Sequence, residues 1–251
     1  MRNQSFEISS DALELLETLV SRSKRKTGVP FSSAFICRRT PEDASPPLAR
    51  LLRGRGGSLR LKLYITFCLL GVGKPHDVFG APYIWAKALA LPESTTSGAR
   101  TVRQATKWLE ARRLVKMGKR KTGEYPKVFL RSQSGNGRAY ARPKESGERY
   151  ARLPTEFWEK GWILKLTGTG IAVLLVLLRL QYGKEANEAP WVKAAWQYDL
   201  SPDTWTRGTE ELVRIGILKK KNVVTGDEQA WRRRRNVYWV RLNRLEKYPP
   251  E

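Results

Sequence analysis

The chain has 251 residues and carries 47 lysines and arginines against 24 aspartates and glutamates, a formal net charge of +23. Hydrophobic residues make up 41% of the sequence, enough for a buried core, so the composition excludes a disordered polycation. A charge this far from zero attracts polyanions. We expect nucleic acid as the first class of partner, ahead of an anionic membrane surface.

Cysteine content and apolar runs bear on the cellular compartment. Cys37 and Cys68 are too few for a disulfide framework and lack the spacing of a zinc site, which favours a reducing interior. Acidic residues interrupt the first apolar positions, where a secretory signal needs an unbroken apolar stretch. The most apolar run, residues 171–178, is far shorter than the about 20 residues of a membrane span and predicts a buried core helix. We therefore expect a cytoplasmic protein, nucleoid-associated if bacterial, with no membrane partner and no metal.

The N-terminal quarter differs in composition from the rest of the chain. Residues 10–20 place apolar side chains at helical spacing, which predicts a short amphipathic helix. Residues 22–57 mix arginine and lysine with prolines and glycines, which predicts an extended, mobile basic arm. A second Gly- and Ser-rich stretch predicts a flexible linker. The predicted division is an arm over residues 1–57, a first domain over 58–131, a linker over 132–150 and a second domain over 151–251.

The first domain shows helices followed by a hairpin. A highly apolar segment that ends before Gly71, Pro82 in a first helical turn and Ser97 as an N-cap predict three helices. Two short apolar segments around a basic, Gly-containing turn predict paired strands. The expected helices cover residues 59–70, 83–91 and 99–113, and the strands cover 114–117 and 127–130. The fold class indicated by these elements is mainly α with small β-hairpins (α+β).

The same order of elements recurs after the linker. Ala-Pro followed by an aromatic residue opens both 81–84 and 189–192, and an apolar-apolar-Lys segment occurs at 114–116 and at 217–219. We interpret this as an internal duplication, with chance similarity of generic helices as the alternative. The second copy has its third helix after Pro202 and its hairpin over residues 219–224 and 237–242.

A three-helix unit with a short turn before its third helix and a hairpin after it resembles the winged helix-turn-helix family. The chain resembles proteins with two such units in tandem, as in some transcriptional regulators and plasmid replication initiators. In that family the third helix normally enters the DNA major groove, and the hairpin, or wing, lies along the backbone or minor groove. The resemblance thus implies two tandem winged helices and double-stranded DNA as the partner.

The third helix of the first unit has two distinct faces. Val102, Ala105 and Leu109 share a stripe that is expected to face the core, which leaves long polar side chains on the other face. Arginine can pair with guanine and glutamine with adenine, whereas lysine suits phosphate. An ordinary solvated helix face is the alternative. The predicted DNA contacts of this unit are Arg100, Thr101, Arg103, Gln104 and Lys107 on the helix and Lys119, Arg120, Lys121 and Lys127 on the wing.

The second unit departs from this pattern. Glu210 occupies the position of Lys107, and a carboxylate repels phosphates, so this helix is either a more selective base reader or does not enter the groove. Four consecutive arginines in the hairpin favour DNA contact, with a solvated turn or a localisation signal as alternatives. The predicted DNA contacts of this unit are Thr204, Thr206, Arg207, Arg232, Arg233, Arg234 and Arg235.

Two further predictions concern oligomers and chemistry. Trp108 is expected to be semi-exposed, which leaves a homodimer open. The only histidine, His76, is expected to be a solvated loop residue, and residues 54–57 lack the Lys and Ser/Thr of a phosphate-binding loop. Because carboxylates also lack a metal-ligand spacing, we expect neither a catalytic site nor a cofactor.

These features favour a sequence-specific double-stranded DNA-binding protein. The function we expect is that of a transcriptional regulator that binds an operator through two winged helices. A plasmid or phage-type replication initiator that binds repeated origin sites is the first alternative. A DNA-packaging or partition protein, held mainly by charge, is the second.

Overall fold

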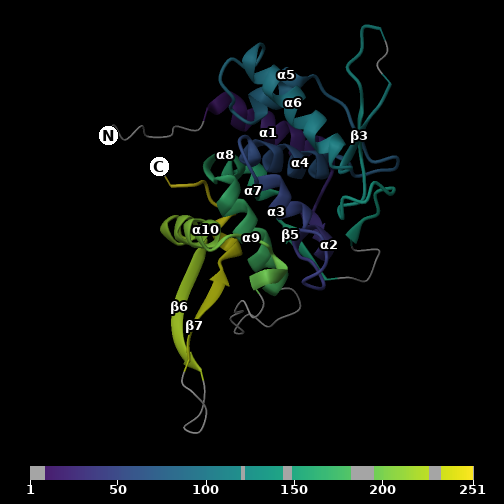
Figure 1. Ribbon diagram of the computed structural model, residues 1–251. Helices are drawn as coiled ribbons and strands as arrows, with labels where there is room; N and C mark the ends of the chain where they lie inside the picture. The colour runs from purple at the N-terminus through teal and green to yellow at the C-terminus, as the bar shows by residue number, and fades with distance from the viewer. Residues whose placement is uncertain (1–8, 120–121, 144–148, 182–194, 226–232, 251) are drawn as a thin grey trace.

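A computed structural model describes residues 9–119, 122–143, 149–181, 195–225 and 233–250 (Figure 1). The architecture is mainly helical with small antiparallel sheets, which confirms the predicted fold class. One hydrophobic core cluster contains residues of both predicted domains, among them Leu61 and Leu174. The tandem winged-helix arrangement and the domain boundaries stay predictions.

The N-terminal segment is folded, so the prediction of an extended basic arm is wrong. Helix α1 (Ser10–Ser23) forms as predicted, but strand β1 (Val29–Ser32) and helices α2 (Ser33–Ile36) and α3 (Pro47–Leu52) come after it. Phe31 and Phe35 are fully buried. Prolines and arginines are frequent in this segment, yet apolar residues between them belong to the core, because their burial is favourable.

Strand β1 pairs with a strand from the far side of the predicted linker. It runs antiparallel to β5 (Tyr150–Leu153), with Val29 opposite Leu153. Within the predicted linker, the Gln133 side chain is buried. It accepts a hydrogen bond from the Ser32 N–H at 2.6 Å and donates one to the Pro30 carbonyl at 3.1 Å. Gln133 and Tyr150 of this segment therefore pack against β1, contrary to the expectation of a flexible linker.

The first unit contains three helices and a three-stranded sheet. The strands are ordered β2-β4-β3, with antiparallel neighbours. The sequence did not predict β2, because a two-residue strand carries too little periodicity to detect. The elements are α4 (Gly57–Leu70), β2 (Asp77–Val78), α5 (Pro82–Ala88), α6 (Ser97–Ala111), β3 (Val115–Met117) and β4 (Val128–Leu130).

The C-terminal part is built around a helix that is buried on all sides. This helix, α9, contains the apolar run 171–178, every residue of which is buried. The predicted start of the second helix of this copy, residues 189–192, lies outside the described residues. The elements are α7 (Glu156–Glu159), α8 (Trp162–Lys165), α9 (Gly168–Gln181), the 3-10 helix η2 (Ala195–Gln197), α10 (Pro202–Arg214), β6 (Leu218–Thr225), β7 (Arg233–Val240) and the 3-10 helix η3 (Leu242–Arg244).

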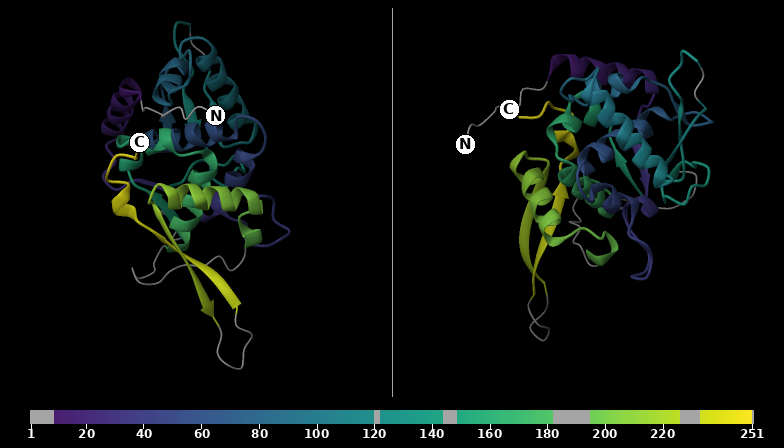
Figure 2. Two further views of the ribbon diagram at one scale, coloured as in Figure 1. Left: turned by 90° about the vertical axis from the view of Figure 1, so that its left-hand side faces the viewer. Right: turned by 45° about the horizontal axis from the view of Figure 1, so that its top comes forward.

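The hairpin of β6 and β7 extends away from the helices at one end of the molecule, while α5 and α6 lie toward the other end (Figures 1 and 2). Its strands pair from Leu218 opposite Val240 to Thr225 opposite Arg233. Across the described parts of the chain, no helix has both the length and the apolar character needed to cross a membrane.

Candidate nucleic-acid interface

Helix α6 has the two faces that the sequence predicts. Val102, Ala105 and Leu109 are buried and pack toward α4 and α5. The opposite face is polar and solvent-exposed. Its exposed side chains include Arg100, Thr101, Arg103, Gln104 and Lys107.

The charge on this outer face is not neutralised within the described structure. Arg100, Arg103 and Lys107 form no ion pair with any residue that the structure describes. The only carboxylate in the α6 sequence, Glu110, accepts a hydrogen bond from the Met117 N–H at 2.7 Å and so ties α6 to β3. The cations of α6 are thus left available for an external anion.

Two residues of α6 have internal partners that the sequence did not indicate. The Thr101 hydroxyl donates to the Ser97 carbonyl at 2.8 Å, a bond within the helix that leaves it an acceptor for an outside donor. Trp108 is half-buried, with the guanidinium of Arg60 4.2 Å and that of Arg112 5.2 Å from its ring centre. These cation–π contacts within the chain account for the partial burial of Trp108, so contact with a second subunit is not needed to explain it. A homodimer stays a prediction.

A cavity of about 450 Å³ lies beside the exposed face of α6. Arg103 and Lys107 line it together with Trp85, Met117 and Tyr125, a residue between β3 and β4. Long cationic side chains can lay their aliphatic stems along such an apolar wall while their charged ends stay in water. This cavity was not predicted from the sequence. Tyr125 and Pro126, two non-charged residues beside a basic turn, were the available signal of an apolar surface there.

The β3–β4 hairpin of the first unit contributes fewer available charges than its sequence indicated. Lys119 is exposed. Lys127 forms an ion pair with Asp77 on β2, with 2.7 Å between Nζ and Oδ2, and this hydrogen bond raises the pKa of Lys127. Arg120 and Lys121 lie outside the described residues.

Helix α10 presents a mixed surface. Thr206, Arg207 and Glu210 are exposed, as predicted. Arg207 lies 3.5 Å from the carboxylate of Asp203 one turn earlier. Thr204 belongs to the helix cap, because its N–H donates to the Ser201 Oγ at 3.1 Å and its hydroxyl accepts from the same oxygen atom at 2.9 Å. The outer face of α10 is therefore less cationic than that of α6.

The β6–β7 hairpin is rich in cationic residues: β6 carries Lys219, Lys220 and Lys221, and β7 carries Arg233, Arg234 and Arg235. Its register sets Arg234 opposite Val224, Arg235 opposite Val223 and Lys221 opposite Val237. Directly opposed like charges destabilise a strand pair, and this offset avoids them. Arg233 also lies on β7, opposite Thr225, whereas Arg232 lies outside the described residues. The sequence placed these arginines before the returning strand, but the structure includes residues 233–235 in that strand.

The structure revises the expectation for His76. This side chain is buried, with its Nδ1 3.0 Å from the Gly71 carbonyl and its ring packed on Tyr140. It is therefore part of the core of the first unit. Within the described residues, no group of three or more His, Cys, Asp and Glu side chains could hold a metal ion.

Comparisons of this chain with protein-family models, with curated proteins and with solved structures found no significant match.

Proposed function

We propose that this protein binds double-stranded DNA, with the outer face of α6 contacting bases. The observation that carries the proposal is the set of exposed side chains on that face, Arg103, Gln104 and Lys107 among them, of which the two cations have no ion-pair partner in the described structure. Arginine and glutamine have the paired donors and acceptors that distinguish guanine and adenine in the major groove. A net charge of +23 favours association with the DNA backbone.

The arrangement of the first unit supports the proposed winged-helix interpretation. Three helices precede a β-hairpin, and α6, the third of them, lies next to that hairpin. The second basic surface, the β6–β7 hairpin, extends from the opposite end of the molecule (Figure 2). One chain would then contact two separate segments of DNA, so binding would not require a dimer.

The role we propose is transcriptional regulation through an operator. Selection from a random duplex library, at salt near physiological concentration, tests both the binding and the role. A defined motif would support sequence-specific recognition. A repeated array of motifs would instead favour a replication initiator, and the absence of enrichment would favour charge-driven DNA packaging.

Substitutions on α6 test which residues contact bases. We expect Arg103→Ala and Gln104→Ala each to weaken binding to the selected site by about 1–3 kcal/mol, with little change in binding to random DNA. Arg22→Ala, an exposed position on α1, is the control. Fluorescence anisotropy with both duplexes measures the difference. Equal loss on both duplexes would rule out a base-contacting role.

A further inference from the structure

A further basic site lies apart from α6 and from the β6–β7 hairpin. A cavity of about 720 Å³ is bordered by α2, α3, the loop that joins them, residues 134–136 and the end of α9. Asp43 is the only carboxylate among its described lining residues. The cavity is lined by five arginines, Arg38, Arg39, Arg50, Arg149 and Arg179.

The single carboxylate is used by its own loop. The Asp43 Oδ2 accepts hydrogen bonds from the N–H groups of Thr40 and Arg39, both at 2.9 Å. These bonds, with a smaller contribution from the Arg39 charge, lower the pKa of Asp43. Asp43 therefore stays ionised and offsets Arg39, whereas the other four arginines form no ion pair with any residue that the structure describes.

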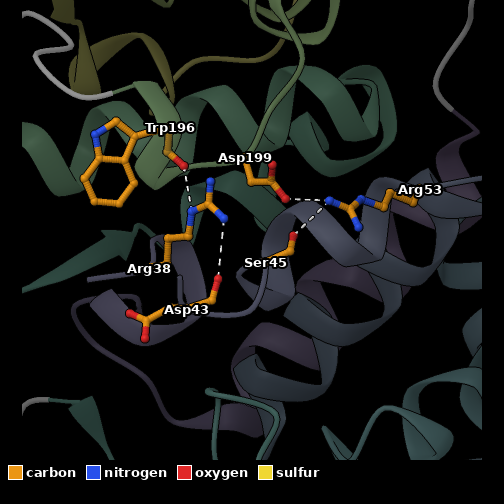
Figure 3. Close-up of polar contacts among 6 residues, drawn as sticks. All are labelled: Arg38, Asp43, Ser45, Arg53, Trp196 and Asp199. Atoms are coloured by element: carbon orange, nitrogen blue, oxygen red, sulfur yellow. Dashed lines mark hydrogen bonds and ion pairs between the residues drawn. The ribbon is translucent and has the colours of Figure 1, made fainter. Parts of the chain in front are cut away.

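Neutral acceptors hold two of those four in position. Arg179 donates from Nε to the Ser33 hydroxyl at 3.1 Å and from Nη1 to the Tyr198 hydroxyl at 3.4 Å. Arg38 donates from Nε to the Trp196 carbonyl at 2.9 Å and from Nη1 to the Asp43 carbonyl at 3.4 Å (Figure 3). Such bonds fix the orientation of a guanidinium group without neutralising its charge.

Arg50 supplies an independent indication of an anion site. Its Nε is buried and has no hydrogen-bond partner among the described residues. Burial, followed by the positive charges of Arg112 and Arg53, lowers the pKa of Arg50. Outside the cavity, by contrast, Arg53 is paired with the carboxylate of Asp199 and also bonds Ser45 (Figure 3). Like charges crowded around a partly buried arginine are unfavourable unless an anion pairs with the guanidinium group.

We propose that this cavity binds phosphoryl groups, such as those of a nucleoside triphosphate. The planar fork of arginine matches phosphate oxygens, and the volume falls within the range of about 300–1,000 Å³ typical of small-molecule sites. The same chemistry is presented by the DNA backbone, so a free polyphosphate and DNA are the two sources to distinguish. The inference does not depend on base contacts by α6.

The test measures binding of tripolyphosphate and of ATP to the full chain by calorimetry, and of a random duplex by anisotropy. The cavity variant is Arg50→Gln/Arg149→Gln. The control, Arg22→Gln/Lys26→Gln, removes the same charge from exposed positions outside the cavity. We expect at least tenfold weaker binding of tripolyphosphate and ATP by the cavity variant and unchanged binding by the control.

Loss of duplex binding in the cavity variant alone, with no tripolyphosphate or ATP binding to the wild type, would assign the phosphoryl groups to DNA. If no probe distinguishes the cavity variant from the control, the proposal is wrong. Thermal unfolding checks that each variant folds, and Arg38→Gln/Arg149→Gln replaces the first variant if Arg50 proves necessary for folding. The α6 substitutions leave this cavity intact, so failure of the base-contact proposal is recorded separately.

Discussion

Two buried threonines illustrate how much a single hydroxyl can matter. The Thr66 Oγ1 accepts a hydrogen bond at 3.2 Å from the indole N–H of the fully buried Trp158, which lies 92 residues further along the chain. The Thr106 hydroxyl only donates to the Val102 carbonyl of its own helix. Both threonines are therefore buried, but only the Thr66 hydroxyl accepts a hydrogen bond from a distant part of the chain.

Replacing Thr66 tests this difference. We expect Thr66→Val to lower the free energy of unfolding by about 1–3 kcal/mol, because the buried indole N–H of Trp158 loses its acceptor. Thr106→Val is the matched control and should change stability much less. Urea denaturation of both variants gives the comparison. Similar losses would mean that the Trp158 bond contributes nothing beyond the packing of a threonine.

Lys62 makes the free energy of unfolding depend on pH in the alkaline range. Burial lowers its pKa to about 8, opposed in part by the negative charge of Glu211, and its Nζ donates to the Leu164 carbonyl at 3.3 Å. In the unfolded chain the pKa is about 10.4, so between these values the unfolded state binds more protons. Lys62 therefore destabilises the fold below pH 8, and this penalty is relieved as the pH rises toward 10.

The corresponding prediction compares Lys62→Met with the wild type from pH 7.5 to 10. We expect the stability of the wild type, relative to that of the variant, to rise across this interval. Chemical denaturation at fixed pH steps measures it. The difference between the proteins isolates Lys62 from the raised pKa values of Tyr64 and Cys68, which act in the opposite direction. A constant difference would show that Lys62 is charged throughout.

Among the secondary-structure elements, α6 and α10 are both amphipathic helices, but their exposed faces carry different charges. Each buries one stripe and exposes the other, so the positions of both could be predicted from helical periodicity. Their outer faces differ, since that of α6 carries Lys107 and that of α10 carries Glu210. On the second unit, positive charge is concentrated instead on the β6–β7 hairpin.

The hairpin should contribute to affinity by binding phosphates. We expect Arg234→Gln/Arg235→Gln to reduce the slope of log affinity against log salt by about 0.9 for each phosphate that the hairpin no longer binds. The control is Arg22→Gln/Lys26→Gln, which removes the same charge from exposed positions near the end of α1. Titration of a random duplex at several salt concentrations gives both slopes. Equal slopes in the two variants would exclude specific phosphate binding by the hairpin.

In the molecule as a whole, the N-terminal segment belongs to the core. Strand β1 is one half of the β1–β5 sheet, and Arg25 donates to the carbonyls of Cys68 and Leu69 at the end of α4, both at 2.8 Å. Removal of this segment would expose the apolar surfaces of α4 and α9 that it covers. It is therefore a structural part of the fold, whatever its contact with a ligand.

Truncation tests this conclusion directly. We expect deletion of residues 1–57 to abolish cooperative unfolding, and Phe35→Ala alone to lower the free energy of unfolding by about 3–5 kcal/mol through loss of a fully buried ring. Circular dichroism during thermal and urea denaturation measures both. If the truncated chain unfolds cooperatively at the wild-type midpoint, the prediction of a dispensable basic arm would be right after all.

Helices α1, α6 and α10, with the exposed faces of α6 and α10, could be predicted from sequence, because apolar residues recur every three to four positions along one continuous segment. Helix α4 could be predicted from its continuous apolar content. The folding of the N-terminal segment, the pairing of β1 with β5 and the two-residue strand β2 became visible only in three dimensions. The same holds for the arginine-lined cavity, which joins Arg50 to Arg179 across more than half the chain. These features depend on contacts between distant residues, and one sequence contains no local pattern that specifies them.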